Sequence, residues 1–335
     1  MNPSVDTPDV SLITPMYNES DCISDNLGKV LPALEELGVE WEYILVDDGS
    51  TDDSYDKARK ILDPVPNCKI VHYQINRGRG YALRQGFSAA RGKYVISTEA
   101  DLSWGADIIK KLYSELILTK SDIVVASVFH EKGGFNNVPV FRRLISYWGN
   151  WVMRLCFESK ISQFSGMTRG YRSGSIQSMH LEENDKEIHL EIIAKAESLG
   201  LHITEIPAHI SWSGNRNKGG LRKKFSILKY VIPHLLSSFN QGSFKVFLLL
   251  SGVLFTFGVI LSSLGVVNKI FSFTPLPMPN LVNYGLILIL MGLVCTMFAG
   301  ISVQLGHVQK NLVHIQSQVK ELTKSKVVES LKDHS

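Results

Sequence analysis

Short apolar runs alternate with longer amphipathic segments along the first 220 residues of the chain. The apolar runs are short and rich in β-branched and aromatic residues, which predicts strands at VSLITPMY (10–17), WEYILVDDG (41–49), CKIVHYQ (68–74) and KYVISTEAD (93–101). Helices are predicted between them at residues 20–37, 51–62 and 80–90. Ser50 or Thr51 is expected to cap the second helix, and Gly92 to close the third. Strands that alternate with helices predict an α/β fold with a doubly wound, mainly parallel sheet.

Polar residues stand where these strands end, as Asn18-Glu19, Asp47-Asp48, Asn76-Arg77 and Glu99-Asp101. The carboxyl ends of parallel strands meet at one edge of a sheet, so these side chains are expected to line one crevice. On an extended strand, Glu99 and Asp101 would point to the same face. Two like charges side by side favour a bound cation or a shared proton. The alternative is an ordinary strand that runs into a polar loop.

Charge is distributed unevenly in the last third of the chain. No charged residue occurs between Lys245 and Lys269, and none occurs in residues 283–306. Each stretch is long enough to cross a hydrocarbon core, which needs ~20 apolar residues in a helix. Two such stretches in tandem, joined by a short segment with three prolines, predict transmembrane helices at about 246–267 and 283–305. Two buried core helices are the alternative.

Basic residues flank this predicted hairpin on both outer sides, in LRKKFSILK (221–229) and at Lys310, Lys320, Lys324 and Lys326. Lysine and arginine gather on the cytoplasmic side, so an integral membrane protein with both termini in the cytoplasm is expected. The predicted divisions are a tail (1–9), an α/β domain (10–220), a basic amphipathic juxtamembrane segment (221–243), the hairpin (244–306) and a final helix (307–335).

Other features of the composition exclude some classes of protein. The polar N-terminus predicts no secretory signal, and a net charge of +3 does not indicate a nucleic-acid partner. The four cysteines lie far apart without a C-x-x-C pair, so we expect reduced, buried thiols.

Apolar residues recur at spacings of 3, 4, 3, 4 and 3 after the second span, at Leu305, Val308, Leu312, Ile315, Val319 and Leu322. This heptad pattern is typical of a coiled coil and predicts that the helix associates with copies of itself. An amphipathic helix that lies on the protein or membrane surface would show the same pattern.

The motifs TPMYNE, LVDDGSTD, NRGRGYALRQG and EADLS, in this order, resemble family 2 of the inverting glycosyltransferases, which have a GT-A fold. The resemblance covers roughly residues 9–220 and is strongest to the polyprenyl-phosphate glycosyltransferases, several of which carry a C-terminal membrane hairpin. It implies a UDP- or GDP-linked sugar donor, a polyprenyl phosphate acceptor and Mg²⁺ or Mn²⁺. One sugar would be transferred with inversion at the cytoplasmic face.

The resemblance assigns a donor-binding role to Pro15, Tyr17, Asn18, Glu19, Asp47, Asp48, Arg77, Gly78, Arg216 and Lys218. Asp47 would accept a hydrogen bond from the base, although an Asx turn and helix cap would also explain Asp47 and Asp48. Gly78 and Gly80 would let the backbone approach the ligand. Arg77 and Arg84 would meet a phosphate, or Arg84 would lie on a solvated helix face. Arg216 and Lys218 would close over the diphosphate, or the basic run there would contact anionic lipid.

Glu99 and Asp101 match the D-x-D motif of the family, whose carboxylates hold the metal against the donor diphosphate. This chain departs from the pattern by placing a glutamate first. The extra methylene moves that carboxylate outward, so we expect Asp101 to be the direct ligand and Glu99 to reach the metal through water.

A second departure lies in residues 163–172, QFSGMTRGYR, where relatives commonly begin the run with an aspartate. Gln163 stands in its place and cannot act as a base at neutral pH. A lipid phosphate is already an anion near pH 7 and needs no base. The substitution therefore favours a phosphate acceptor, or loss of activity, over a hydroxyl acceptor.

The acceptor side is assigned by resemblance to Arg142 and Ser146, four residues apart, and to Glu191. Glu191 would orient acceptor-side groups, or would be an ordinary surface residue. Trp148, Trp151 and Met153 suit a helix that lies in the membrane interface, although a core helix would also carry them. An arginine expected after the strand DIVVAS is replaced by Val128, so His130, Lys132 or Arg143 would have to substitute.

The leading hypothesis is thus a membrane-bound, metal-dependent hexosyltransferase that acts on polyprenyl phosphate. A transferase with a hydroxyl acceptor is the first alternative, disfavoured by Gln163, by the absence of a Q-x-x-R-W motif and by only two spans. The second alternative is a catalytically weak relative that serves as a membrane scaffold, in line with Glu99, Val128 and Gln163.

Overall fold

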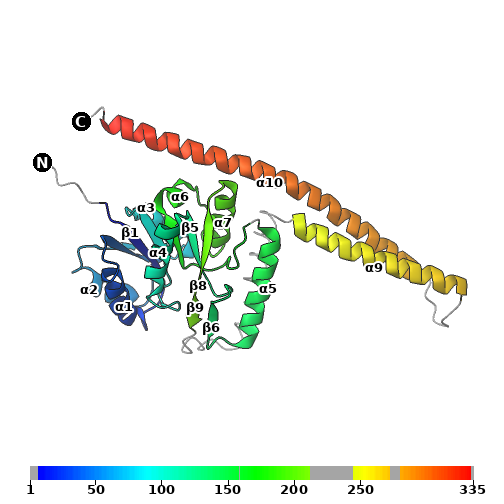
Figure 1. The fold of residues 1–335 in the computed structure, drawn as a ribbon, viewed down its shortest axis with the longest axis horizontal. Helices are drawn as coiled ribbons and strands as arrows, with labels where there is room; N and C mark the ends of the chain where they lie inside the picture. Colours follow the sequence, from blue (N-terminus) through cyan, green and yellow to red (C-terminus); the bar gives the residue numbers. More distant parts are fainter. Residues whose placement is uncertain (1–6, 158, 212–243, 272–279, 333–335) are drawn as a thin grey trace. The chain divides into compact units, whose positions relative to one another are not determined.

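A computed structural model describes residues 7–157, 159–211, 244–271 and 280–332 (Figure 1). The α/β domain contains β1 (Val10–Met16), α1 (Ile23–Glu35), β2 (Trp41–Asp47), α2 (Ser54–Leu62), β3 (Cys68–His72), α3 (Arg79–Ala89), β4 (Tyr94–Ser97), α4 (Ile108–Thr119), β5 (Ile123–Ser127), β6 (Gly134–Asn136), α5 (Val140–Cys156), β7 (Arg169–Arg172), α6 (Ser173–Ser178), α7 (Ile188–Ser198), β8 (Ile203–Pro207) and β9 (His209–Ser211). The helices α9 (Phe244–Phe271) and α10 (Leu281–Lys332) follow.

Seven strands form the main sheet in the order β3-β2-β1-β4-β7-β5-β8. All neighbours pair in parallel except β7, which is antiparallel to both β4 and β5. The strands β6 and β9 make a separate parallel pair. The predicted doubly wound, mainly parallel sheet is therefore confirmed, with one antiparallel strand that the sequence did not indicate.

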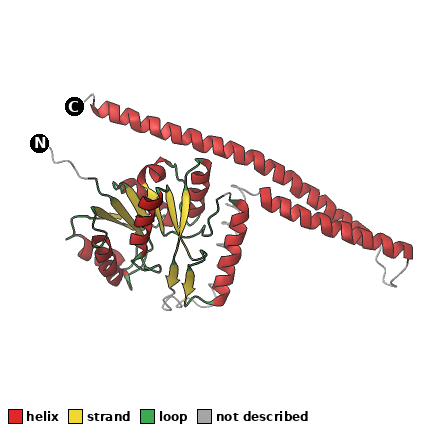
Figure 2. Cartoon of the chain, in the orientation of Figure 1, coloured by secondary structure: helices red, strands yellow, loops and turns green. Residues whose placement is uncertain are grey.

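Apolar side chains cover both faces of the sheet, so successive residues of β1 are buried in opposite directions. Leu12 belongs to a core cluster with α1 and α4, whose members include Leu27 and Leu112. Ile13, next along the strand, is fully buried against Gly86 of α3. Helices lie on both sides of the strands, as Figure 2 shows. Strands buried on two faces read as continuous apolar runs, which explains the pattern of the sequence.

Several predicted boundaries differ from those observed. The helix α2 begins at Ser54; its N-cap residue Asp53 makes no capping bond, and the Ser54 amide donates to the Asp52 side chain at 3.0 Å. Ser50 and Thr51 are used elsewhere, because Ser50 bonds Asp47 and the amide of Thr51 bonds Asn18. The strand β4 ends at Ser97, four residues before the prediction, and α3 closes at Ala90 rather than at Gly92.

The cysteine prediction is correct in part. Cys22, Cys68 and Cys295 form no disulfide, as expected. They are partly exposed, however, so the expectation that they are buried is wrong for these three.

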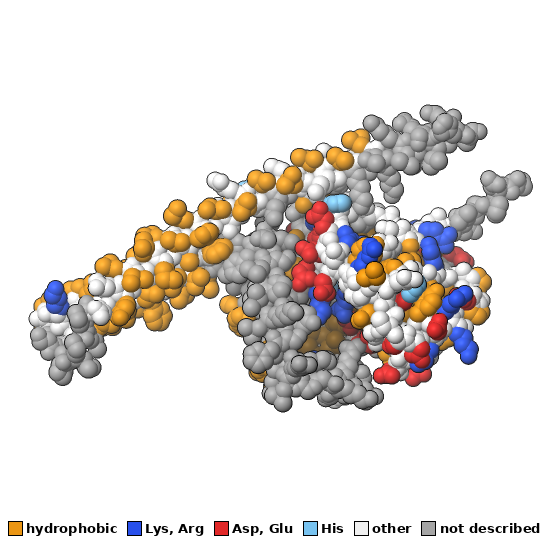
Figure 3. All heavy atoms as spheres, turned by 180° about the vertical axis from the view of Figure 1, so that it is seen from behind, with side chains coloured by type: hydrophobic (Ala, Val, Ile, Leu, Met, Phe, Trp, Pro, Cys, Tyr) orange, Lys and Arg blue, Asp and Glu red, His pale blue; other side chains and the backbone are white. Residues whose placement is uncertain are grey.

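The helices α9 and α10 contain segments that are long and apolar enough to cross a membrane, Phe247–Phe271 and Leu281–Val319. Only 11% of the most apolar window of each is buried inside the protein, which disfavours a pair of core helices. Hydrophobic side chains cover the described surface of both helices (Figure 3). The second predicted span and the predicted final helix form a single helix, α10.

Small residues let α9 and α10 pack closely against each other. A side chain at Gly285 would meet the Gly258 carbonyl oxygen at 2.6 Å, so both positions need glycine. Ser251 Oγ donates a hydrogen bond of 2.8 Å to the Gly292 carbonyl. Close backbone approach and hydrogen bonds of this kind hold helices together where there is no hydrophobic drive between them.

Replacing Gly86 with alanine should destabilise the α/β domain, although alanine is the better helix former. The new Cβ would clash with Cγ2 of Ile13, a buried β-branched side chain that cannot turn away. Overpacking of this kind costs roughly 1–3 kcal/mol. The measurement is the thermal unfolding midpoint of the full chain in detergent.

Gly28→Ala is the matched control, since Gly28 also lies within a helix but a Cβ added there would meet nothing within 4 Å. It should raise the unfolding free energy by about 1 kcal/mol. Equal effects of the two substitutions would contradict the tight contact between α3 and β1.

Candidate active site

The predicted site residues that follow β1, β2, β3 and β4 lie at the carboxyl edge of the sheet. The chain runs from β1 outward to β2 and β3 and then returns to β4 on the other side of β1. In open α/β sheets a ligand crevice is expected at such a change of direction, here between the loops that follow β1 and β4. The four polar strand ends of the sequence therefore belong to loops at one edge of the sheet.

The loop after β1 is fastened to the loop after β2. Asn18 adopts a φ of 53° and accepts a hydrogen bond of 2.8 Å from the Thr51 amide, while its own amide donates to Ser50 Oγ. The amide of Glu19 donates to Ser54 Oγ at 2.8 Å. Tyr17 projects from this loop and is exposed, and Pro15 is partly buried. Asn18 thus holds the loop in shape, and Tyr17 is available to a ligand.

Asp47 is fully buried at the end of β2. Its carboxylate accepts a hydrogen bond of 3.2 Å from the Ser50 amide and lies 2.7 Å from Nδ1 of His72. Of the two roles considered for Asp47, the turn role is present.

Asp48 accepts four hydrogen bonds from the segment after β3. The donors are the Tyr73 hydroxyl (2.7 Å), the Arg77 amide (2.9 Å), and the Asn76 side chain and Gly78 amide (3.0 Å each). Burial raises the pKa of the Tyr73 hydroxyl most, and the hydrogen bond to Asp48 raises it further. The hydroxyl therefore remains protonated and a donor near neutral pH. Asp48 therefore shapes the loop at residues 76–78 and is fully occupied by it.

The glycines of this loop make room for the protein's own backbone. A side chain at Gly80 would meet the Glu183 carbonyl oxygen at 2.5 Å, and one at Gly78 would clash with the Asn184 carbonyl. The Gly80 amide donates to that Asn184 carbonyl at 2.8 Å. These glycines were expected to let the backbone approach a ligand. In the structure they let it approach the backbone of Glu183 and Asn184.

The two arginines expected at a phosphate behave differently. Arg84 donates to the Leu181 carbonyl and to the Asn184 side chain, so neither a phosphate contact nor a solvated face describes it. Arg77 lies over the ring of Tyr81 and remains exposed. Of these two arginines, Arg77 is the one whose charge remains exposed.

Glu99 and Asp101 lie in a turn beyond the end of β4, so the expected extended geometry is wrong. The turn is closed by the Leu102 amide, which donates to the Glu99 carbonyl at 3.1 Å. The two carboxylates nevertheless meet at Ser103, whose hydroxyl donates to Glu99 at 2.6 Å and whose amide donates to Asp101 at 3.0 Å. Arg79 lies 3.9 Å from Glu99 and offsets part of the negative charge.

These two carboxylates fit a hard divalent cation. Both are partly exposed, and carboxylate oxygens are the ligands such cations prefer. In the part of the chain that the structure describes, no group of three or more His, Cys, Asp or Glu side chains gathers as a metal site. The protein would therefore supply one or two oxygens and leave the other positions to phosphates and water.

The segment that carries Gln163 is held from two sides, by β8 and by α5. Glu205 of β8 accepts the amides of Ser162 and Gln163 at 2.6 and 2.8 Å. Asn150 of α5 accepts the Phe164 amide at 3.0 Å. Gln163 is buried, and its Oε1 has no hydrogen-bond partner among the described residues. Buried polar atoms are rarely left unpaired, so this oxygen is a candidate to bind a ligand.

The helix α5 carries Arg142 and Ser146 one turn apart; Arg142 is exposed and Ser146 half-buried. Val128 is buried at the position of the missing arginine. Of its suggested substitutes, Arg143 lies over the ring of Phe135, while His130 and Lys132 lie in the loop before β6.

Glu191 is buried, so the surface alternative is wrong. Its two carboxylate oxygens accept the amides of Glu182 and Glu183 at 2.8 and 3.0 Å, and Lys195 Nζ lies 2.7 Å away. These bonds fix the segment that packs against Gly78 and Gly80. Glu191 therefore acts as a positioning residue in this conformation.

Two predicted residues, Arg216 and Lys218, lie outside the described residues. The sequence reasoning also missed Arg79, Ser103, Asn150 and Glu205. Arg79 could have been found, because it is the second arginine of NRGRG and opens α3. Ser103 could also have been found, because it ends the EADLS motif, two and four residues after its partners. Asn150 and Glu205 carry no local signal, since they bond residues that are distant in the sequence.

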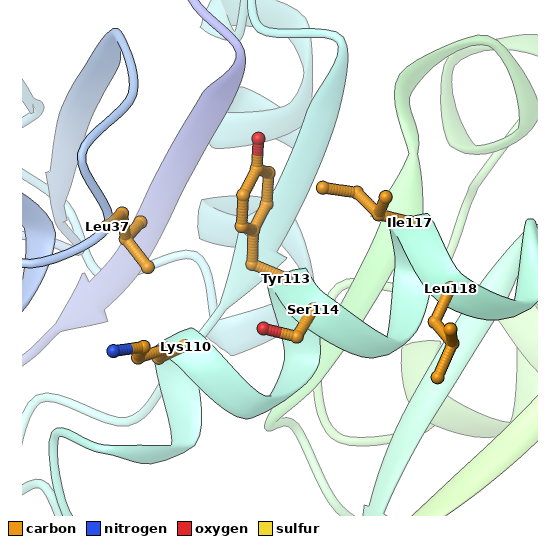
Figure 4. A pocket seen from close by; sticks show the side chains of 6 residues that line it. All are labelled: Leu37, Lys110, Tyr113, Ser114, Ile117 and Leu118. Atoms are coloured by element: carbon orange, nitrogen blue, oxygen red, sulfur yellow. The ribbon is translucent and has the colours of Figure 1, made fainter.

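Two surface hollows lie along α4. One of about 400 Å³ is lined by Leu37 and by α4 residues including Tyr113 and Ile117 (Figure 4). A second, of about 640 Å³, is lined by the next face of α4 with Lys132, Pro207 and His209. Of the residues considered for the site, only Lys132, a suggested substitute for the missing arginine, lines either of these two hollows.

Known proteins resemble this chain in sequence. An undecaprenyl-phosphate 4-deoxy-4-formamido-L-arabinose transferase of Edwardsiella ictaluri is 28% identical over 232 residues, 68% of each chain. A dolichol-phosphate mannosyltransferase of Pyrococcus furiosus is 30% identical over 189 residues, 56% of this chain and 52% of that protein.

The fold has solved counterparts as well. Glucosyl-3-phosphoglycerate synthase from Mycobacterium tuberculosis, solved in complex with Mn²⁺, uridine diphosphate and phosphoglyceric acid, superposes with a TM-score of 0.52 at 18% identity. The match covers 69% of this chain and 78% of that one. Residues 11–181, more than half of the chain, match the family described as Glycosyl transferase family 2. Together with the acid pair at the carboxyl edge of the sheet, this match shows that the chain belongs to glycosyltransferase family 2.

Proposed function

We propose that this glycosyltransferase moves one sugar from a nucleotide donor to a polyprenyl phosphate at the cytoplasmic face of a membrane. The observation that carries the proposal is the pair Glu99 and Asp101, both held on Ser103 beside the change in strand order. The names of the relatives in Edwardsiella and Pyrococcus and the two candidate spans support a lipid acceptor.

The donor would bind across the loops that follow β1, β2 and β3. Tyr17 is exposed beside Pro15 and can pack on a nucleoside, and Asp47 would accept the base N–H if His72 gives way. Arg77 and Arg79 would face the diphosphate. Arg216 and Lys218 remain candidates to cover it. The base, and hence UDP or GDP, would be selected in this part of the crevice.

Glu99 and Asp101 would hold Mg²⁺ or Mn²⁺ against the donor diphosphate, Asp101 directly and Glu99 with the help of water. When bound, the cation neutralises the charge that develops on the leaving nucleoside diphosphate. Ser103 keeps the two carboxylates together through its hydroxyl and its amide. Arg79 adds positive charge on the side of Glu99.

Transfer would proceed by a single displacement with inversion. An oxygen of the acceptor phosphate forms a bond to the anomeric carbon as the bond from that carbon to the nucleotide breaks. The acceptor needs no deprotonation because the second pKa of a phosphate monoester is roughly 6. Gln163 would therefore not act as a base, and its unpaired Oε1 would accept a hydrogen bond from a sugar hydroxyl.

Arg142 and Ser146 of α5 would bind the acceptor phosphate, with a guanidinium that suits its charge. The same helix exposes a stripe of Phe141, Leu144, Trp148 and Trp151. Such a stripe, with arginines beside it, suits the headgroup region of a bilayer. Arg142 and Ser146 would thus bind the acceptor phosphate in the headgroup region of the membrane, where lipid phosphates lie.

Both termini are proposed to be cytoplasmic, since the lysines after the second span and the basic run before the first favour that side.

The proposal extends to self-association of the chain through the C-terminal part of α10. A hydroxyl acceptor remains the second candidate, and the absence of a carboxylate at Gln163 counts against it.

The acceptor class can be tested by incubating membranes that contain the protein with labelled UDP- and GDP-sugars, with and without Mg²⁺ or Mn²⁺. Metal-dependent label that enters the organic phase and is released by mild acid is expected. Label found only in polymer would favour a hydroxyl acceptor. No label with any donor would favour a scaffold.

Asp101→Asn should lower the rate of transfer by roughly 100-fold or more, the scale of losing one electrostatic contact in a transition state. The amide oxygen can still accept the Ser103 amide, so the turn should persist. Asp107→Asn is the control, because Asp107 pairs with Lys111 on the surface of α4. Wild-type turnover of the Asp101 variant would remove Asp101 from the metal site.

Gln163→Glu should give no more than a small gain in rate, because the phosphate acceptor has no proton that must be removed. Rates are measured with polyprenyl phosphate from pH 6 to pH 9. A large rise in rate that follows ionisation of the new carboxyl would instead indicate a mechanism that requires a base.

Replacing Trp148 and Trp151 together with glutamate should raise the KM for polyprenyl phosphate in liposomes by roughly 10-fold or more, from lost burial of two aromatic side chains. The KM for the nucleotide sugar should not change, since neither side chain is placed at the donor. Phenylalanine at both positions should restore the lower value. An equal rise in both KM values would point to a damaged fold and against membrane contact by α5.

A further inference from the structure

An apolar stripe runs along α10 beyond the predicted span at 283–305, in the last part of the apolar segment Leu281–Val319. Leu305, Val308, Leu312 and Ile315 follow one another at spacings of 3, 4 and 3 and are 56%, 54%, 51% and 54% exposed. We call these four residues the α10 seam. The spacing continues in the sequence at Val319 and Leu322. Large apolar side chains half-exposed in a regular stripe indicate a surface that another apolar surface covers.

The seam lies on a different side of α10 from the contact with α9. That contact is made by Gly285, Gly292 and Ala299, which recur every seven residues and are buried. At about 100° per residue, the mean direction of the seam is about 180° from that of these three residues. A partner along the seam would therefore leave the hairpin intact.

The residues beside the seam suit a second copy of the same helix. In heptad notation, with Leu305 and Leu312 at a and Val308 and Ile315 at d, the flanking e and g positions are all uncharged amides: Gln304, Gln309, Asn311, Gln316 and Gln318. Identical helices side by side thus meet no like-charge repulsion. Lys310 falls at position f of the heptad, outside the a, d, e and g positions.

The direction of the partner also follows from the chain. The seam continues a helix whose first part is a candidate membrane span, so copies in the same membrane present it in the same direction. A bilayer surface is a poorer partner, because interfacial helices carry many lysines and arginines on the polar face. Residues 304–318 contain one, Lys310.

We propose that the α10 seam binds the α10 seam of a second copy of this chain in a parallel coiled coil. The contact would bring at least two catalytic domains together at one place on the membrane. It does not depend on which acceptor the enzyme uses.

Cysteine cross-linking of the full chain in membranes tests the contact. The four native cysteines are replaced with serine, and Ile315→Cys is compared with His314→Cys, its exposed neighbour at position c. On mild oxidation, the Ile315→Cys chain should form a covalent dimer at least 10-fold faster. Equal rates would indicate random collision, and no dimer from either chain would indicate another partner; both results would overturn the proposal.

A second measurement keeps the native cysteines. The mass of the detergent-solubilised protein is measured for the wild type, for Leu312→Asp with Ile315→Asp, and for Ser317→Asp at position f. The double variant should become monomeric, while the wild type and Ser317→Asp remain oligomeric. A monomeric wild type, or an unchanged mass for the double variant, would overturn the proposal. Neither measurement requires transferase activity, so failure here is distinct from failure of the proposed function.

Discussion

The crevice depends on carboxylates that accept the backbone amides of its loops. Loops at the end of a sheet have N–H groups that no neighbouring strand can satisfy, and an unpaired buried amide costs about 1–3 kcal/mol. Asp48, Glu191 and Glu205 each accept two such amides. Hydrogen bonds to a charged acceptor are roughly twice as strong as neutral ones, which makes these three side chains effective clamps.

Asp48 and Glu191 are linked by a continuous series of hydrogen bonds that runs from the end of β2 to α7. Asp48 fixes the segment that contains Gly78, Gly80 donates to the Asn184 carbonyl, and Glu191 fixes the two residues before Asn184. Loops fastened in this way keep their shape when no ligand is bound. Since electrostatic catalysis requires groups that are already in position, this rigidity is part of the chemistry.

The acidic residues of the crevice therefore fall into two groups, which differ in burial. Asp48 and Glu191 are buried and saturated by the protein's own donors, whereas Glu99 and Asp101 are partly exposed and share Ser103. A carboxylate that already accepts two amides has little capacity left for a cation or a substrate. Exposure thus separates the positioning acids from the candidate metal ligands, which residue type alone does not.

Three apolar surfaces of the chain differ in period and in charge. The hairpin helices are apolar on all sides, as lipid-facing helices are. The helix α5 carries one apolar stripe with arginines beside it, and α10 ends in a stripe bordered by uncharged amides. Each combination suits a different neighbour: hydrocarbon, headgroups, and another copy of the helix.

The sequence by itself determined the features that depend on local periodicity. These are the alternating strands and helices, the two apolar helices, the heptad stripe and the position of the polar residues at strand ends. Period and charge are properties of neighbouring residues, so they can be read without knowing the fold.

Only the tertiary structure decided features that depend on residues far apart in the chain. The strand β7 enters antiparallel between β4 and β5, Gly80 is required by the backbone of Glu183, and Glu191 is buried by the segment it holds. The turn that joins Glu99 and Asp101 on Ser103 is an exception, because it replaced an expected strand through contacts of no more than four residues. The burial of a side chain and the pairing of a strand depend on contacts from the whole domain, so a local sequence pattern does not predict them.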